Sequence, residues 1–378
     1  MSDNKNKDVT GVLRQFQIEG TVERHYPFGS GHINDTYRVE TKEVNSLNYL
    51  LQRVNHNIFK NVPKLIENID RVTSHLRRKL HQVPGADPDR EVLTLIPTYQ
   101  GAKFVQDEEG NYYRLYIFIE DHNAYDIVET VHQAQEAGKM FGRFQNFLSD
   151  IPGGPLYETI PDFHNIESRL DKLFEAVKVD KVGRVKKVKE LLKFVEERAD
   201  EMKILLNLYR DGDIPERVTH NDTKFNNVLL DKQDNGLCVI DLDTIMPGIA
   251  HYDFGDSIRT GTNTAAEDEP DLYKVNMNID LYEGYTRGYL EEMRSLTDLE
   301  IQFLPLGAKL LPYMIGTRFL TDYLDGDNYF KIHREGHNLQ RAKAQYKLLS
   351  SMEEQYARMQ DIVSQVNADL TENPEINS

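Results

Sequence analysis

The clearest chemical signal in the sequence is a His-x-Asp-x-x-x-x-Asn pattern formed by His220, Asp222 and Asn227. Phosphoryl transfer to a hydroxyl group needs a carboxylate beside the acceptor oxygen and oxygen ligands for Mg²⁺, and this spacing supplies both from one loop. We therefore expect Asp222 to accept the proton and to aim the hydroxyl group. Asn227 is expected to give its side-chain carbonyl oxygen to the metal, because a hard cation prefers oxygen ligands. His220 is expected to order the loop backbone by hydrogen bonding.

Two further carboxylates follow at the end of a predicted β-hairpin. The apolar runs Val228–Leu230 and Leu237–Ile240 flank a polar turn, and Asp241 and Asp243 come directly after the second run. Asp241 stands where a kinase-like catalytic hairpin carries its second metal-binding carboxylate, and we expect it to bridge Mg²⁺ to the β and γ phosphates. Side chains alternate along an extended chain, so Asp243 points to the same side and could assist a second ion.

The tripeptide Asp253-Phe254-Gly255 has the same letters as the metal-binding tripeptide of protein kinases. It lies beyond Met246-Pro247-Gly248 and does not directly follow a strand that pairs with the one after Asn227. We therefore expect Asp253 to cap a helix or to brace the catalytic loop, and not to bind a metal.

These residues need a scaffold, and the chain changes character near residue 122. Residues 11–122 have the patterns of strands, whereas residues 123–378 are dominated by helical periodicity. We expect an α+β protein with a two-lobed, protein-kinase-like fold. Its antiparallel β N-lobe would span residues 1–122 and bind the nucleotide, and its mainly helical C-lobe would span residues 123–378 and hold the catalytic hairpin and the acceptor site. The predicted N-lobe elements are strands Leu47–Val54, Val92–Pro97 and Tyr112–Glu120 and a helix over Ile58–Leu80 that starts near Pro63.

The second part of the chain is predicted to be built from long helices. They cover Ala124–Leu148, residues 164–178, residues 182–210 and much of residues 270–365. The most apolar stretch, Phe303–Leu320, contains Lys309, Pro312 and Arg318, which would be costly in a membrane span. We expect a buried helix or pair of helices there and no membrane partner.

The composition narrows the class of partner. The chain has 378 residues, with 45 Lys and Arg against 62 Asp and Glu, and a formal net charge of −17. That charge repels polyanions, so nucleic acid is excluded as the main partner, whereas a small phosphate ligand with a divalent cation is not. Cys238 is the single cysteine, so no intramolecular disulfide can form. The polar segment Met1–Thr10 has no signal-peptide core, and a cytoplasmic location is expected.

The catalytic loop resembles that of the aminoglycoside phosphotransferase and choline kinase superfamily. More narrowly, four segments resemble the N-acetylhexosamine 1-kinases, namely Gly29–Tyr37, Leu51–Asn55, His220–Asn227 and Val239–Gly248. This resemblance implies ATP and Mg²⁺ as cofactors. It implies phosphorylation of the anomeric C1 hydroxyl group of a small sugar acceptor, GlcNAc or GalNAc, to the sugar 1-phosphate. It also implies Asp222 as the base and Asn227 and Asp241 as metal ligands.

The resemblance also places the nucleotide. The turn over residues 29–36 is implied to cover the phosphates, since glycines let backbone amides approach them. A basic residue is expected on the following strand to hold the α and β phosphates, but Tyr49–Arg53 contains no lysine, so Arg53 is the candidate. The adenine is expected against the hinge Ile119–His122 through backbone hydrogen bonds. The nucleotide-binding candidates are therefore Gly29, Ser30, Gly31, Ile33, Thr36, Arg53, Glu120 and Asp121.

The acceptor is expected near Arg318. An arginine within an apolar region needs a partner or a ligand, and the resemblance implies that Arg318 and Tyr329 hold the sugar. The alternatives are a salt bridge from Arg318 to Asp322, one helical turn on, and a packed Tyr329 whose hydroxyl group lies at the surface. Three further candidates for the sugar site, each with a purely structural alternative, are His32, Asn34 and Arg259.

Two other functions stay open at this point. A kinase of the same fold could act on another small alcohol, such as a different sugar, an amino alcohol or an aminoglycoside, and the acidic net charge keeps cationic acceptors in play. The chain could also be a nucleotide-binding pseudokinase, although the intact set of Asp222, Asn227 and Asp241 argues against it. The motifs do not set a preference between GlcNAc and GalNAc, and they leave the oligomeric state open.

Overall fold

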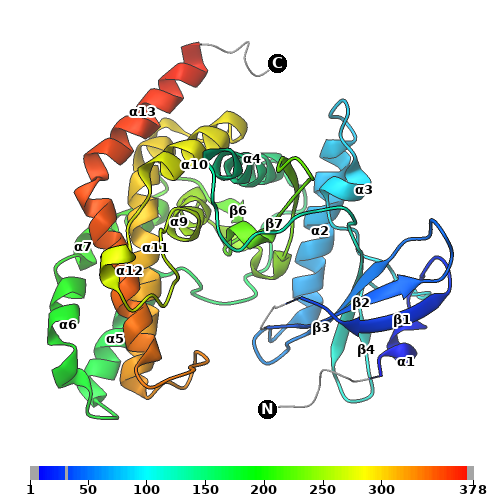
Figure 1. The fold of residues 1–378 in the computed structure, drawn as a ribbon, viewed down its shortest axis with the longest axis horizontal. Helices are drawn as coiled ribbons and strands as arrows, with labels where there is room; N and C mark the ends of the chain where they lie inside the picture. The colour runs from blue at the N-terminus through cyan, green and yellow to red at the C-terminus, as the bar shows by residue number, and fades with distance from the viewer. Residues whose placement is uncertain (1–7, 30–32, 373–378) are drawn as a thin grey trace.

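The computed structural model of the protein describes residues 8–29 and 33–372 (Figure 1). An antiparallel sheet lies at one end of the molecule and the C-terminal helices lie at the other, with α4 (Val131–Leu148) and two short two-stranded sheets drawn between them. This architecture confirms the α+β, two-lobed fold that the sequence predicts. The division of the chain into domains at residue 122 stays a prediction.

The strands and helices have the following bounds. The strands are β1 Val22–Pro27, β2 Asp35–Thr41, β3 Tyr49–Val54, β4 Val105–Gln106, β5 Tyr112–Ile117, β6 Arg217–Thr219, β7 Val228–Leu230, β8 Gly236–Val239 and β9 Met246–Gly248. The remaining helices are α1 Thr10–Leu13, α2 Val62–Leu80, α3 Pro88–Glu91, α5 Ile166–Val179, α6 Lys189–Glu196, α7 Ala199–Met202, α8 Ile204–Asp211, α9 Ala250–Gly261, α10 Ile279–Glu292, α11 Asp298–Asp325, α12 His337–Glu354 and α13 Tyr356–Glu372.

The five-stranded sheet has the strand order β1-β2-β3-β5-β4. Its side chains alternate between two faces, as the pleat requires. Tyr49 and Leu51 of β3 belong to a core that includes α1, whereas Leu50 and Val54 pack into the large core that includes α2 and α4. Even-numbered residues of β3 therefore face the helical part of the molecule, and odd-numbered ones face away from it.

Capping chemistry fixes where two predicted helices begin. Asn61 accepts a hydrogen bond from the backbone N–H of Lys64 at 3.2 Å, and Pro63 lies in the first turn of α2, which confirms the predicted start. Helix α4 begins later than the predicted start at Ala124. Thr130 accepts a hydrogen bond from the N–H of Gln133 at 3.1 Å and sets the N-terminus there.

Two predicted elements are wrong in part. Val92–Pro97 is not a strand, because only Leu95 forms a bridge to β5 and Pro97 has no N–H to continue a ladder. The sheet edge is formed by β4 instead. The helix predicted over residues 182–210 is divided into α6, α7 and α8, and its breaks keep the apolar side chains on the core around α11.

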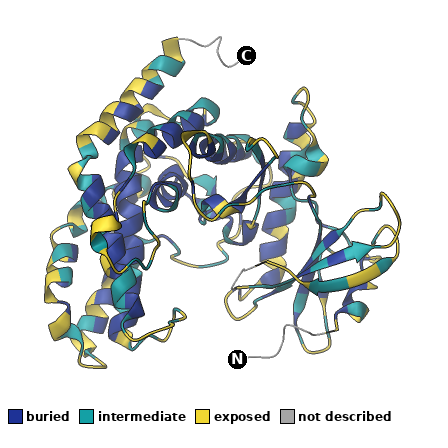
Figure 2. Cartoon of the chain, viewed as in Figure 1, coloured by how far each residue is buried: buried dark blue, intermediate teal, exposed yellow. Residues whose placement is uncertain are grey.

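The apolar stretch around Phe303–Leu320 lies within one continuous helix, α11, in spite of Pro305 and Pro312. A capping box between Thr297 and Glu300 begins this helix, and most of its side chains are buried (Figure 2). Within residues 8–29 and 33–372, no helix combines the length and apolar character needed to cross a membrane.

Two helix crossings depend on glycine. A Cβ atom at Gly255 would collide with the backbone carbonyl group of Gly307, so glycine lets α9 cross α11 in contact. Gly138 does the same for α4, which lies against the Tyr285 carbonyl group of α10. The glycine of the Asp253-Phe254-Gly255 tripeptide therefore has a packing role.

Candidate active site

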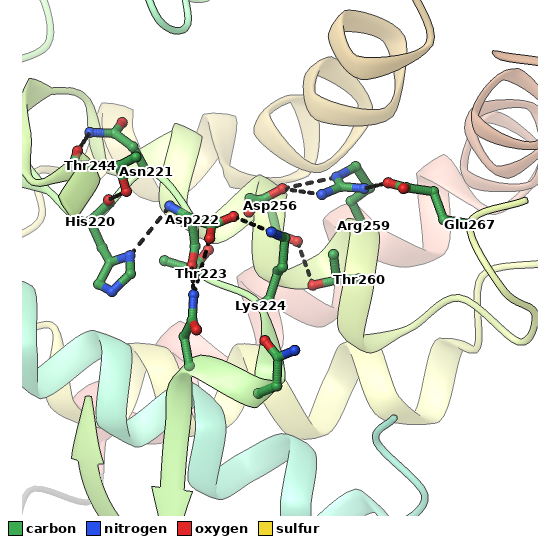
Figure 3. A network of polar contacts seen from close by, with 12 residues as sticks. His220, Asn221, Asp222, Thr223, Lys224, Thr244, Asp256, Arg259, Thr260 and Glu267 are labelled. Carbon is green, nitrogen blue, oxygen red and sulfur yellow. Dashed lines mark hydrogen bonds and ion pairs between the residues drawn. The ribbon is translucent and has the colours of Figure 1, made fainter. Parts of the chain in front are cut away.

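The catalytic loop connects β6 to β7 and holds the Asp222 carboxylate from two sides (Figure 3). Lys224 Nζ lies 2.7 Å from Asp222 Oδ1, and Asn227 Nδ2 donates a hydrogen bond to Asp222 Oδ2 at 3.2 Å. Asn227 Nδ2 also donates to the Asp222 backbone carbonyl group at 2.8 Å. Among the described residues, none donates a hydrogen bond to the Asn227 side-chain oxygen, so this oxygen is open to a cation.

Asp253 holds the backbone of this loop by hydrogen bonds, as the sequence predicts. Its carboxylate accepts hydrogen bonds from the backbone N–H groups of His220 and Asn221, both at 2.7 Å, and from Gln145 Nε2 at 2.6 Å. Burial raises the pKa of Asp253 to about 6. The backbone of Asn221 has a φ of 65°, so the chain passes through the left-handed region at the point where Asp253 holds it.

His220 orders the backbone, which is also the predicted role. Its Nε2 lies 2.8 Å from the Ile240 carbonyl oxygen, and its Nδ1 accepts a hydrogen bond from the Asp222 N–H at 3.3 Å. The ring packs edge-on against Phe141 and Phe144 of α4. His220 therefore links the catalytic loop to the strand end that precedes Asp241.

Asp241 follows β8 in a left-handed conformation, with a φ of 59°. Burial and the negative charges of Asp243 and Asp222 raise the pKa of Asp241 to about 7. The three carboxylates therefore lie close enough to repel one another, and a divalent cation would relieve that repulsion. In the described residues, no three His, Cys, Asp or Glu side chains form a metal cluster. Asp241 and the Asn227 oxygen still fit Mg²⁺, which takes few protein ligands and completes its shell with phosphate and water.

Asp243 is engaged by the N-terminal sheet. Its Oδ1 forms an ion pair with Arg114 Nη1, and its Oδ2 accepts a hydrogen bond from Asn34 Nδ2 at 2.6 Å. Asn34 also accepts a hydrogen bond from the N–H of Asn55 at 3.0 Å. Asp243 and Asn34 are thus hydrogen-bonded to each other. Binding of a second metal ion by Asp243 and binding of a sugar by Asn34 stay predictions.

The predicted phosphate-covering turn is only partly described, since Ser30, Gly31 and His32 lie outside the described residues. Gly29 has a φ of 78°, which only glycine adopts easily, and the N–H of Phe28 donates to the Thr36 carbonyl oxygen at 2.9 Å to close the turn. Ile33 is 50% exposed, available for contact with a ligand. Thr36 lies opposite Gln52 and accepts a hydrogen bond from its Nε2 at 3.3 Å.

Arg53 does not face the catalytic loop. It is an odd-numbered residue of β3, and its Nε donates to Asp35 Oδ2 at 2.7 Å across the strand pair. By the alternation of the sheet, Arg53 shares the face of Tyr49 and Leu51, which carries the core with α1. Its predicted contact with phosphate stays a prediction that this placement does not favour.

The predicted hinge is tied to its surroundings. Glu120 accepts hydrogen bonds from Arg38 Nη2 and Asn48 Nδ2, both at 2.8 Å, and Asp121 lies 2.8 Å from Lys232 Nζ. Arg90 donates to the carbonyl oxygens of Glu120 and Asp121. These carboxylates therefore shape the hinge, and each carbonyl oxygen keeps a second lone pair for a ligand.

Arg318 has no counter-ion among the described residues: no carboxylate of theirs lies within 4.0 Å of it. Its guanidinium group lies over the rings of Phe163 and Phe330, at 5.8 and 5.4 Å. The alternative of a salt bridge to Asp322 is wrong, because that carboxylate instead accepts backbone hydrogen bonds from Asn328, Tyr329 and Phe330 at 2.8–2.9 Å. Burial lowers the pKa of Arg318. Tyr329 is 73% exposed on the loop that Asp322 holds.

Arg259 forms a structural ion pair, one of the two predicted alternatives. Its guanidinium group lies 2.7 Å from Asp256 and 3.0 Å from Glu267 (Figure 3). Asp256 also lies near the ammonium group of Lys224, which it stabilises in the charged form. Arg259 is therefore neutralised within the protein, unlike Arg318.

Three site residues were missed by the sequence analysis. Lys224 lies inside the catalytic motif, and its position two residues after Asp222 was the available signal. Arg114 interrupts the apolar run of β5, which marks it as a buried cation in need of a partner. Arg169 has no such signal, because it lies on an ordinary amphipathic helix, α5.

The fold and the site together define a class of protein. A catalytic loop with a held aspartate, an asparagine and a following carboxylate, beneath an antiparallel sheet, is the arrangement of protein-kinase-like phosphotransferases. A sequence model of the phosphotransferase enzyme family matches residues 25–299. The chain belongs to this family.

Solved structures with the same fold have low sequence identity. A microcompartment-associated aminopropanol kinase is 15% identical, with a TM-score of 0.58, over 93% of this chain and 97% of that one. An amicoumacin kinase in complex with AMP-PNP, Ca²⁺ and amicoumacin is 13% identical, with a TM-score of 0.59, over 91% and 94% of the two chains. A spectinomycin phosphotransferase in complex with ADP and spectinomycin is 13% identical, with a TM-score of 0.53, over 94% and 96%.

Proposed function

We propose that this protein transfers the γ-phosphoryl group of ATP to the anomeric C1 hydroxyl group of an N-acetylhexosamine, GlcNAc or GalNAc, and releases the sugar 1-phosphate. The observation that carries the reaction type is the nearness of Asp241, which follows β8, to the loop whose Asp222 carboxylate is held by Lys224 and Asn227. The sugar rests on the resemblance of the four sequence segments to N-acetylhexosamine 1-kinases.

In this proposal, Asp222 accepts the proton of the acceptor hydroxyl group and sets its direction. Lys224 and Asn227 fix the carboxylate so that little reorganisation is needed when the acceptor arrives. Mg²⁺, held by Asp241 and Asn227, would supply charge neutralisation at the phosphates. ATP as donor is supported by the AMP-PNP and ADP complexes of the structural neighbours.

The charge of the acceptor site favours a neutral sugar over an amino alcohol or aminoglycoside. Arg318 lacks a described carboxylate partner, and burial together with nearby Arg318 lowers the pKa of Arg169 to about 10. Arg169 donates to the carbonyl oxygens of Asp162 and Phe163, and its Nε is buried without a hydrogen-bond partner in the described structure. Two guanidinium groups without counter-ions would repel an ammonium group and suit an oxygen-rich acceptor.

A pseudokinase is the weaker alternative. The catalytic loop keeps both its aspartate and its asparagine, and Asp253 holds the loop backbone through two hydrogen bonds. A protein that does not catalyse phosphoryl transfer does not need a catalytic loop held in one fixed conformation. A cytoplasmic location, where ATP is available, completes the proposal and fits the single, buried Cys238.

The test is ADP production with MgATP and a panel of acceptors: GlcNAc, GalNAc, glucose, galactose, choline and kanamycin. The proposal predicts turnover with the N-acetylhexosamines and little with the cationic acceptors. Turnover with choline or kanamycin alone would leave the phosphotransferase in place and overturn the sugar site. ATP binding without turnover on any acceptor would favour the pseudokinase.

A further inference from the structure

The N-terminal sheet has a buried cation on the face that meets the catalytic hairpin. Arg114 of β5 is 1% exposed and stands directly opposite Gln52 of β3. Gln52 is even-numbered, so it shares the face of Leu50 and Val54, toward the helical part of the molecule. Arg53, its neighbour, faces the other way. The sequence predicts a phosphate-holding cation at Arg53. In the structure, the arginine on the face toward the helical part of the molecule is Arg114 instead.

The surroundings of Arg114 aim it at the predicted metal carboxylates. Gln52 Oε1 accepts hydrogen bonds from Arg114 Nε at 3.0 Å and Nη2 at 2.8 Å, which fixes the plane of the guanidinium group. The remaining nitrogen, Nη1, forms the ion pair with Asp243. Two further arginines share this face, and both are already paired: Arg24 with Glu40, and Arg38 with Glu40 and with Glu120 near the hinge.

We propose that Arg114 is the cation with which the N-terminal sheet holds the nucleotide phosphates, and that Asp243 is its counter-ion while the nucleotide is absent. The inference rests on the ATP-binding part of the proposed function. A buried guanidinium group without an anion is costly, and in the free protein Asp243 supplies that anion to Arg114. A planar fork of donors also suits phosphate oxygens. On nucleotide binding, Arg114 would leave the Asp243 carboxylate and pair with the phosphate oxygens.

The test is nucleotide binding in EDTA, measured by calorimetry for ATP and for adenosine, so that no metal and no acceptor is involved. Arg114→Gln alone would leave the buried Asp243 carboxylate with its hydrogen bond from Asn34 but without a counter-ion, which could unfold the protein. The informative variant is therefore Arg114→Gln/Asp243→Asn, compared with Asp243→Asn, in which the Gln52 oxygen and the nearby Asp241 carboxyl group still face Arg114. Arg24→Gln, which removes an exposed arginine from the same sheet, is the control for lost charge, and melting temperatures verify folding.

We expect Asp243→Asn to bind ATP at least as tightly as wild type, because Arg114 loses its competitor. The double variant should bind ATP about tenfold or more weakly than Asp243→Asn, with adenosine affinity unchanged. Equal ATP affinity in the two variants, or a loss of ATP affinity that appears in Arg53→Gln instead, would overturn the inference alone. Failure of the wild type to bind ATP with or without Mg²⁺ would overturn the proposed function as well.

Discussion

At the scale of single residues, the site holds more carboxylates than cations. Asp222, Asp241 and Asp243 lie close together, and only Lys224 and Arg114 are paired with any of them in the described structure. Each carboxylate is therefore defined by its partner. Asp222 is fixed by Lys224 and Asn227, and Asp243 by Arg114 and Asn34, whereas Asp241 has no ion-pair partner among the described residues and is open to a bound cation.

Replacing Asp222 by Asn should remove the proton acceptor while keeping the shape of the loop. We expect kcat to fall by about 10²- to 10⁴-fold with little change in the KM for ATP. Steady-state kinetics with saturating acceptor measure both constants. A kcat within a few fold of wild type would show that Asp222 is not the base.

Replacing Asp253 by Asn should lower the free energy of unfolding by an amount that depends on pH. Asn at this position can accept only one of the two N–H groups, so Asp253→Asn should lower the free energy of unfolding by about 1–3 kcal/mol. The pKa of Asp253 is about 6 in the folded protein against a reference value of 3.8, so the folded state binds more protons than the unfolded state between these values. Its contribution to stability therefore falls as pH rises through this window.

The destabilisation by Asp253→Asn should accordingly be larger at pH values near 4 to 5 than at pH values above 6. Urea unfolding of wild type and variant in the two ranges measures the difference. A difference that is constant with pH, or larger at the higher pH, would mean that Asp253 does not titrate in this way.

At the scale of elements, two helices and one loop place the site. Helix α9 presents Asp253 to the catalytic loop and crosses α11 at Gly255, and α11 carries Arg318 and Asp322. The loop over residues 328–330, which we propose to hold the acceptor, donates backbone hydrogen bonds to Asp322, and Asn338 Nδ2 donates to the same carboxylate at 2.8 Å. The packing of α9 on α11 therefore connects the catalytic loop to the loop over residues 328–330.

The crossing of α9 and α11 can be tested with alanine. Gly255→Ala would place a methyl group against the Gly307 carbonyl group, and we expect a loss of about 1–3 kcal/mol in the free energy of unfolding. Gly261→Ala on the same helix is the matched control, because its Cβ would meet only Val128 at 3.4 Å. Denaturant unfolding that shows equal effects for the two variants would contradict the crossing.

The loop that Asp322 holds should govern acceptor binding alone. Asp322→Ala removes the acceptor of three backbone N–H groups, so we expect the KM for the acceptor to rise about tenfold or more while the KM for ATP stays near its wild-type value. Steady-state kinetics with each substrate varied in turn measure the two constants. An equal rise in both would mean that Asp322 acts on general stability.

At the scale of the whole molecule, the negative net charge contrasts with the two arginines of the proposed acceptor site. The chain carries a formal charge of −17, whereas Arg318 and Arg169 have no described carboxylate within ion-pair distance. Attraction of a cationic acceptor by the overall field is therefore opposed at the site itself. Local charge should decide the outcome, because bulk charge is screened beyond about 10 Å at 0.1 M salt.

Acceptor charge can be tested with two sugars that differ at one group. Glucosamine carries an ammonium group where GlcNAc carries a neutral acetamide, and we expect kcat/KM for glucosamine to be at least about tenfold lower near neutral pH. Raising the pH, which neutralises the amine, should reduce the difference. Equal kcat/KM values for the two sugars would contradict an acceptor site governed by Arg318 and Arg169.

The sequence predicts local features well and long-range pairings poorly. The catalytic loop, the start of α2 and the role of Asp253 are visible because spacing and capping act over a few residues. The contact of Asn34 with Asp243 joins residues 209 positions apart, and the pairing of Arg114 with Asp243 depends on strand register. No local pattern encodes that register, so Arg53 was the candidate where the three-dimensional fold brings Arg114.

The central claim is the transfer of phosphate to the anomeric oxygen, and phosphorus NMR of the product tests it most directly. Wild type and Asp222→Asn are incubated with MgATP and GlcNAc, and the new signal is assigned by its coupling to the C1 proton. The account predicts a sugar 1-phosphate from wild type and almost none from the variant. Two results would contradict the account: a phosphate group on the C6 oxygen of the sugar, or consumption of ATP without any phosphorylated sugar.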